Sequence, residues 1–186
     1  MLDAAPRSTW EDVIDVPATS IDDEVLEKLV SKHASGIHYI AAPKFPIAAD
    51  SFQQGFFLVV AENILQKNDF VVMDVAHDFS DVSIELLSSA SNILLVLAPE
   101  MASLRAGIGA LSIYDQLGFA PDKIKVTLNH NSSEVTNGIK QAQIEKVLGH
   151  PVDLVIPYGP GEVSRAINFG EPFLLKNREL PVSMRI

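Results

Sequence analysis

Hydrophobic residues form short continuous runs along this chain, and segments of helical periodicity separate them. The runs that look like buried strands lie at residues 37–43, 70–74, 93–97, 124–128 and 151–157. An apolar three-to-four-residue repeat predicts helices over residues 20–36, 48–66, 82–90, 101–117, 139–148 and 162–168. Strands that are apolar on both faces and alternate with helices are typical of βαβ units. The pattern therefore predicts a three-layer α/β/α fold with a mainly parallel sheet, as one domain over residues 1–186.

Polar or proline-rich residues follow each predicted strand: "AAPKFP", "DVAHDFSD", "APEMASLR", "LNHN" and "IPYGPGE". In parallel sheets, ligands bind beyond the carboxyl ends of the strands, so we expect these five stretches at one edge. The second stretch contains Asp74, His77, Asp78 and Asp81. We expect Asp81 to cap the helix that follows it.

Composition excludes several classes of protein. The formal net charge is −10 and the basic residues are scattered, so binding to nucleic acid is not expected. There is no cysteine, which excludes disulfides and thiol chemistry. No apolar run is long enough for a membrane span, and the N-terminus lacks the pattern of a secretory signal. We therefore expect a cytoplasmic protein without an integral membrane segment.

The stretch "DFVVMDVAHDFSDVSIELLSSASNILLVLAPEMASLRAG", with "KVTLNH" and "IPYGPGEVSRAINFGEPFLL" after it, resembles the MinD/ParA class of deviant Walker ATPases. Within that class it is most similar to CpaE/TadZ-type proteins of Flp/Tad pilus assembly. The resemblance implies a P-loop NTPase-like fold of the MinD type, with ATP and Mg²⁺ as cofactors. It also implies a homodimer gated by nucleotide, which docks on pilus or secretion proteins and reaches the membrane or cell pole through them.

The resemblance assigns roles to four residues. Asp74 matches the Walker B aspartate, a catalytic residue that holds Mg²⁺ through water. Asn129 matches the asparagine that reads the adenine edge, and its amide offers the required donor and acceptor. Pro157 and Tyr158 match a turn whose backbone lines the base pocket. Ordinary alternatives remain open, since Asp74 could cap a helix and Asn129 could belong to a polar turn.

Two departures from the family pattern stand out. No G-x-x-x-x-G-K-[ST] motif occurs, and no Gly-Lys dipeptide occurs either. The family's first two strands, which carry the phosphate loop, would lie before Met1. Asp78 stands near the position of a family glycine that faces the γ-phosphate, where a carboxylate would repel the nucleotide. We therefore expect no ATP hydrolysis from this chain alone. Whether the protein is an enzyme remains open.

Two other functions are alternatives to the nucleotide-gated dimer that the resemblance implies. One is an interaction module, a degenerate relative that dimerises or docks without nucleotide. The other is a metal-dependent hydrolase that uses Asp74, His77 and Asp78. A sheet without its central strand should also expose a strand edge, which predicts self-association or local rearrangement.

Overall fold

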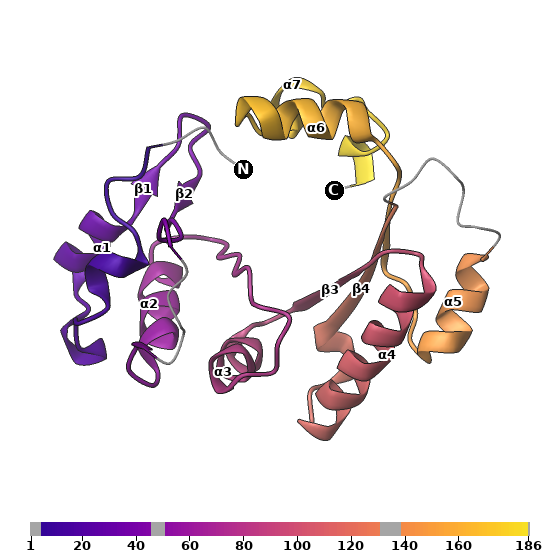
Figure 1. Ribbon diagram of the computed structural model, residues 1–186, viewed down its shortest axis with the longest axis horizontal. Helices are drawn as coiled ribbons and strands as arrows, with labels where there is room; N and C mark the ends of the chain where they lie inside the picture. Colours follow the sequence, from indigo (N-terminus) through magenta and orange to yellow (C-terminus); the bar gives the residue numbers. More distant parts are fainter. Residues whose placement is uncertain (1–4, 46–50, 131–138, 186) are drawn as a thin grey trace. The chain divides into compact units, whose positions relative to one another are not determined.

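The computed structural model describes residues 5–45, 51–130 and 139–185. The chain divides into two compact units, residues 2–90 and residues 91–186. Figure 1 labels their helices and strands. Among the described residues, no helix is both long enough and apolar enough to span a membrane.

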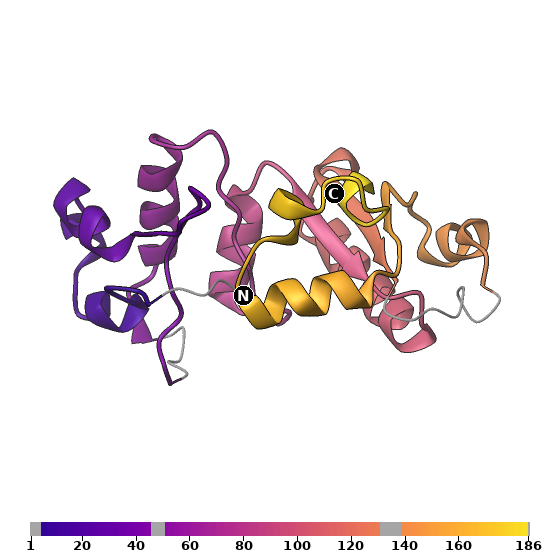
Figure 2. The ribbon, with the colours of Figure 1, turned by 90° about the horizontal axis from the view of Figure 1, so that it is seen from above.

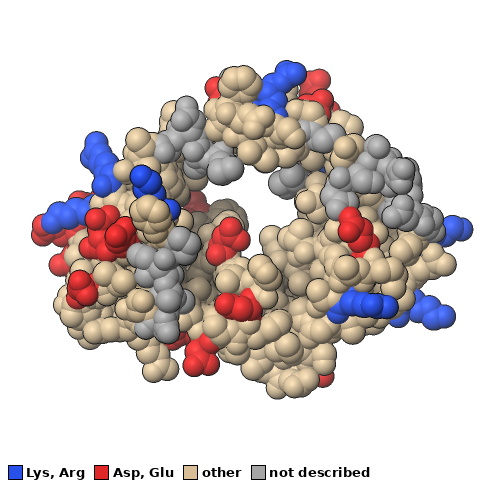
Figure 3. Space-filling view, viewed as in Figure 1, with Lys and Arg blue, Asp and Glu red and all other residues tan. Residues whose placement is uncertain are grey.

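The N-terminal unit consists of short helices around a small two-stranded sheet. Its helical elements are η1 (Trp10–Val13), η2 (Ala18–Ser20), α1 (Asp23–Leu29), α2 (Phe56–Leu65) and α3 (Asp81–Ser89). The strands are β1 (Ser31–Lys32) and β2 (His38–Tyr39), which pair in antiparallel register. An isolated parallel bridge joins Thr9 to Ala41. On the face that Figure 3 shows, both acidic and basic side chains of this unit are present, in keeping with the scattered charges of the sequence.

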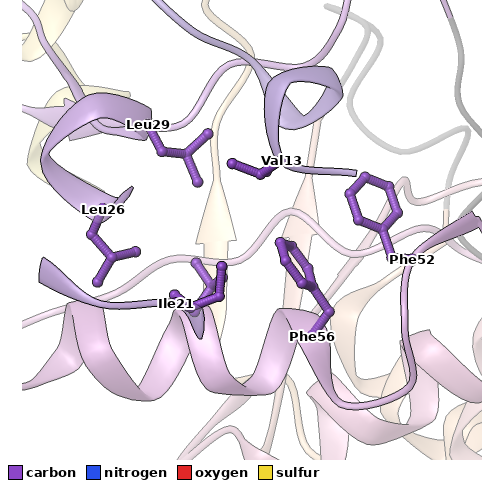
Figure 4. Packing of buried hydrophobic residues seen from close by; sticks show 7 residues of the cluster. Val13, Ile21, Leu26, Leu29, Phe52 and Phe56 are labelled. Carbon is purple, nitrogen blue, oxygen red and sulfur yellow. The ribbon is translucent and has the colours of Figure 1, made fainter. Parts of the chain in front are cut away.

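Aromatic rings dominate the core of the N-terminal unit. Trp10 lies against Phe52, Phe56 and Phe57, with ring centroids 5.1 to 6.5 Å apart. Aliphatic side chains complete this core: Val13, Ile21, Leu26, Leu29 and Val60. Figure 4 shows side chains from η1, α1 and α2 pointing toward one another. The three phenylalanines therefore belong to the core and do not form an exposed patch.

Three helices in this unit have boundaries that differ from the sequence-based expectation. The first helix covers only Asp23–Leu29, because Asp22 caps it and Val30 is already extended. Gly36, expected to end that helix, instead lies in the turn between β1 and β2 with φ +92°. The second helix begins at Phe56, after Gly55 adopts a left-handed conformation with φ +77°. For the third helix, Ser80 rather than Asp81 is the N-cap.

The strand predicted over residues 70–74 is not formed. These residues have no ladder partner in the part of the chain that the structure describes. Phe70 is 88% exposed and Val72 is 91% exposed. A strand needs a neighbour for its backbone groups, so an apolar sequence alone does not make one.

The C-terminal unit is built on a parallel sheet. Its strands β3 (Ile93–Leu97), β4 (Ile124–Asn129) and β5 (Leu154–Ile156) lie in the order β3-β4-β5. The main helices are α4 (Met101–Gln116), α5 (Gln141–Leu148), α6 (Pro160–Phe169) and α7 (Phe173–Lys176), with η4 (Pro121–Lys123) and η6 (Ser183–Arg185) as short turns. The pairs Ile93↔Ile124 and Thr127↔Leu154 set the register. The alternation of strands and helices thus yields the parallel α/β arrangement that the sequence predicted.

The two faces of this sheet differ. On one face, Leu97, Val126 and Leu128 pack with Leu104 of α4 and Ile144 of α5. On the other, Leu94 and Val96 of β3 are 65% and 55% exposed. The helices α6 and α7 lie next to each other in both views (Figure 1, Figure 2). The core of this unit therefore lies between the sheet and the pair α4 and α5.

Candidate functional site

The carboxyl ends of β4 and β5 bring three of the four predicted site residues together. Asn129 is the last residue of β4, and its register partner is Ile156 of β5. The backbone N–H of His130 donates to the Ile156 carbonyl at 3.0 Å, so the two strands stay paired up to their ends. Pro157 and Tyr158 follow directly on Ile156. Asn129 and the turn after β5 are therefore neighbours at the ends of the two strands.

The strand β4 is the central strand of this sheet and pairs on both sides. Val126 is fully buried and Leu128 nearly so, whereas Asn129 is exposed at the strand end. Asp153 fixes the start of β5 on β4, since its carboxylate accepts from the Val126 N–H at 2.9 Å and its own N–H donates to the Val126 carbonyl at 2.9 Å. This clamp sets which residue of β5 lies beside Asn129.

The turn after β5 leads directly into α6. Pro157 is half-buried and Tyr158 is 42% exposed. Gly159 is the N-cap of α6, and a Cβ at that position would lie 3.2 Å from a methyl carbon of Val182. Pro160 occupies the first helical position, where its missing N–H costs no helical hydrogen bond. The turn is therefore compact, and Val182 near the C-terminus packs against it.

Asp74 lies in the N-terminal unit, within the segment that has no ladder partner. Its side chain is exposed. The expected Walker B geometry, a carboxylate at the end of a sheet strand, is therefore not formed in this unit. The role of Asp74 as a magnesium ligand stays a prediction.

Asp78 belongs to a hydrogen-bonding network at the start of α3. Its Oδ1 accepts from the hydroxyl of Ser83 at 2.7 Å and from the hydroxyl of Ser80 at 2.8 Å. These bonds hold the pKa of the Asp78 carboxyl below its ordinary value, with the Ser83 bond as the main cause. The carboxylate at this position therefore supports the helix start.

Metal binding has no assembled ligand set in the described residues. No three His, Asp or Glu side chains there lie close enough to hold an ion. Asp74, His77 and Asp78 are all described, and they do not form such a group. A magnesium ion has no assembled ligand set among these residues as they stand, and the base-contact roles of Asn129, Pro157 and Tyr158 stay predictions.

Arg105, in the stretch that follows β3, lies on α4 with its side chain exposed, as an ordinary surface arginine does. The polar loop after His130 lies outside the described residues. One residue of interest was missed: Ser183, whose buried hydroxyl has no hydrogen-bond partner among the described residues. Nothing in the pattern of "LPVSMRI" marks that serine.

Solved structures of ParA and MinD proteins are similar to this chain in fold. A ParA family ATPase from Chlorobium tepidum TLS superposes on the whole chain with a TM-score of 0.86, at 17% identity and over 76% of its own length. The chain has the ParA/MinD ATPase fold. MinD in its complex with MinC, from Aquifex aeolicus, aligns with 98% of the chain and 71% of its own length, with a TM-score of 0.76 and 20% identity. The predicted P-loop NTPase-like fold is thereby confirmed.

Two further comparisons are with a protein solved with a nucleotide and with a protein described as ATP-binding. MinD from Pyrococcus horikoshii OT3, solved with Mg-ADP, aligns over 98% of this chain and 71% of its own length, with a TM-score of 0.70 and 18% identity. An uncharacterized ATP-binding protein from Methanocaldococcus jannaschii is 29% identical over 119 residues. That match spans 63% of this chain and 43% of the relative, less than half of its length. No protein-family model matches the sequence.

Proposed function

We propose that this chain supplies the base-binding part of a ParA/MinD-type ATPase of the CpaE/TadZ branch. In this proposal, nucleotide binding gates dimerisation, and the dimer docks on pilus or secretion assembly proteins. The observation that carries the proposal is the juxtaposition of Asn129 with Pro157 and Tyr158 at the paired ends of β4 and β5. The resemblance in sequence and the ParA/MinD fold support it.

The chain's own residues would perform only the recognition step. The Asn129 amide presents one donor and one acceptor to the base, and the Pro157–Tyr158 backbone forms the wall beside it. No phosphate-gripping glycine loop occurs in the sequence. A triphosphate clamp would have to come from residues outside these 186. When bound, Mg-ATP would bring the charged phosphates to this clamp, which would hold them between two protomers.

Base recognition can be tested by titrating ADP into the purified chain and measuring affinity by NMR. We expect weak saturable binding, and Asn129→Ala should weaken it by about tenfold, the value of one to two lost hydrogen bonds. Asn168→Ala is a matched control, because Asn168 is exposed on α6. Equal loss in both variants would contradict the proposed role of Asn129.

Hydrolysis is a separate test. We expect no Mg²⁺-dependent ATP turnover from the 186-residue chain, since the residues that would clamp the phosphates are missing from it. Turnover that disappears in Asp74→Ala would refute this expectation directly. Turnover that survives the substitution would point to contamination or to a different chemistry.

A second candidate is a nucleotide-independent interaction module. The Asp78 network favours it, because a carboxylate at this position serves the start of α3 and would repel a phosphate. An N-terminally extended chain that carries the upstream residues discriminates between the two. Saturable ATP binding by that longer protein supports the ATPase proposal, and the absence of binding supports the module.

A further inference from the structure

The strand β5 carries little information about its own register. It consists of three residues, Leu154, Val155 and Ile156, and each of them is apolar and half-buried. A strand fixes its pairing firmly where one face is buried and the other is polar, and β5 has no such alternation. A slip by one residue would place Val155 or Pro157, instead of Ile156, beside Asn129. The register therefore depends on contacts outside the strand.

Asp153 supplies such a contact just before β5 begins. Its Oδ2 accepts a hydrogen bond from the Val126 N–H at 2.9 Å, and its own N–H donates to the Val126 carbonyl at 2.9 Å. The carboxylate thus takes the place of a ladder carbonyl one position before the first register pair, Thr127 and Leu154. Val126 is fully buried, so its N–H needs this acceptor. The two bonds hold the start of β5 opposite one residue of β4.

Two neighbouring contacts do not perform the same task. Lys125 Nζ lies 3.8 Å from Asp153 Oδ1, and both side chains are partly exposed, so this ion pair contributes little. Glu145 of α5 accepts a hydrogen bond from the Val152 N–H at 3.2 Å. That bond ties the chain to α5, whereas the Asp153 carboxylate ties it to β4.

We propose that Asp153 is a positioning residue of the base site, which in the proposed function consists of Asn129, Pro157 and Tyr158. This inference rests on the proposed function. The hydrogen bond to Val126 sets a register that continues to the pair of Asn129 and Ile156, about 10 Å along the strand. Pro157 follows Ile156 directly, so the register decides which part of the turn lies beside Asn129. Asp153 acts through the ladder and not by contact with the nucleotide.

The affinity test titrates ADP into the full 186-residue chain by NMR. Asp153→Ala removes the acceptor and should weaken binding by about three- to tenfold, because a displaced Asn129 amide loses the same hydrogen bonds as an absent one. Asp153→Asn keeps an oxygen that can accept from the Val126 N–H, so it should retain most of the affinity. Asp122→Ala is the matched control, since it removes the same charge from an exposed position in η4, just before β4.

Hydrogen exchange supplies the readout that is specific for the register. The His130 N–H donates to the Ile156 carbonyl at 3.0 Å, at the far end of the strand pair. In Asp153→Ala this N–H should exchange about three- to tenfold faster than in the wild type, and in Asp153→Asn it should stay protected. If Asp153→Ala does not fold, Asp153→Glu replaces it with the same expected losses, because its carboxylate is displaced by one methylene.

A variant of the core separates the register from stability in general. Ile93 is 5% exposed on β3, which does not pair with β5 in the described sheet. Ile93→Val removes one buried methylene and should lower the Tm. It should leave the ADP affinity unchanged, because Asp153 and the pairing of β4 with β5 are intact.

The outcomes separate this inference from the proposed function. Lost affinity and faster His130 exchange in Asp153→Ala, both restored in Asp153→Asn, support the inference. If Asn129→Ala weakens ADP binding and Asp153→Ala does not, the base site stands and the positioning role is refuted. An equal loss of affinity in Ile93→Val, Asp122→Ala or Asp153→Asn would trace the effect to stability or charge and overturn the inference. If the wild-type chain binds no ADP, the base site in this chain is refuted and the role of Asp153 with it.

Discussion

Asp78 fixes the start of α3 through one carboxylate oxygen. The hydroxyls of Ser80 and Ser83 both donate to it, and the Ser80 hydroxyl also accepts from the Ser83 N–H at 3.4 Å as the helix cap. A carboxylate accepts such bonds better when it is ionised, so they lower its pKa. Whether Asp78 also blocks hydrolysis in an extended chain stays a prediction.

The Asp78 network predicts a specific pH dependence of stability. Because the folded pKa is depressed, the stabilisation is present above the unfolded value of about 3.9 and is lost as pH falls through the lower folded pKa. We expect acidification from pH 6 to pH 3 to lower the urea midpoint more in the wild type than in Asp78→Ala. Ser83→Ala, which removes the main donor, should show an intermediate change. An equal pH response in all three proteins would contradict the network.

Site residues differ in how far the sequence could reveal them. The neighbouring positions of Asn129 and Pro157 were predictable, because parallel strands place their carboxyl ends at one edge and the apolar runs mark where those ends lie; their base-contact roles stay predictions. The burial of Ser183 was not predictable. Its burial depends on the packing of the C-terminal residues against Gly159, a contact between positions 23 residues apart that no local pattern encodes.

The packing of α4 on β3 depends on a glycine. A Cβ at Gly107 would lie 2.6 Å from Cδ1 of Leu97, a side chain that is only 4% exposed. At Gly109, two residues away on the same helix, a Cβ would meet nothing within 4 Å. Alanine substitutions at the two positions therefore distinguish the effect of helix propensity from the effect of packing against Leu97.

Alanine substitutions at these glycines should have different effects. Gly109→Ala should stabilise the protein by about 0.5–1 kcal/mol, because alanine is the better helix former. In Gly107→Ala the same gain is offset by overpacking of about 1–3 kcal/mol against Leu97. We expect Gly107→Ala to be the less stable of the two by urea denaturation. Equal stabilities would show that Leu97 moves aside at no cost.

The strands β3 and β4, which have ladder partners, were predicted correctly, whereas the strand predicted over residues 70–74, which has none among the described residues, was not. The predictions for residues 93–97 and 124–128 are confirmed because β3 and β4 pair along their length. The run at 70–74 has the same apolar character, yet its residues pair with nothing in the described chain. Sequence measures the tendency to form a strand, whereas the ladder requires a neighbour that lies elsewhere.

At the scale of the whole molecule, both units expose large apolar side chains. Phe70 and Val72 are almost fully exposed in the N-terminal unit, and Leu94 and Val96 are exposed on β3 of the C-terminal unit. Among the described residues, β3 pairs on one side only, with β4. Each unit thus exposes apolar residues from a run that was predicted to be a strand, and a further strand could cover them.

An apolar strand with one free edge and no charged residue is a template for pairing with another chain. We therefore expect this chain to self-associate with increasing concentration, as measured by light scattering after size-exclusion chromatography. Val96→Lys should shift the protein toward the monomer, because a lysine on an edge strand opposes pairing. Val147→Lys is the matched control, since Val147 is 51% exposed on α5 and Val96 is 55% exposed. A wild type that stays monomeric at every concentration, or an equal effect of both lysines, would rule out the β3 edge as the contact.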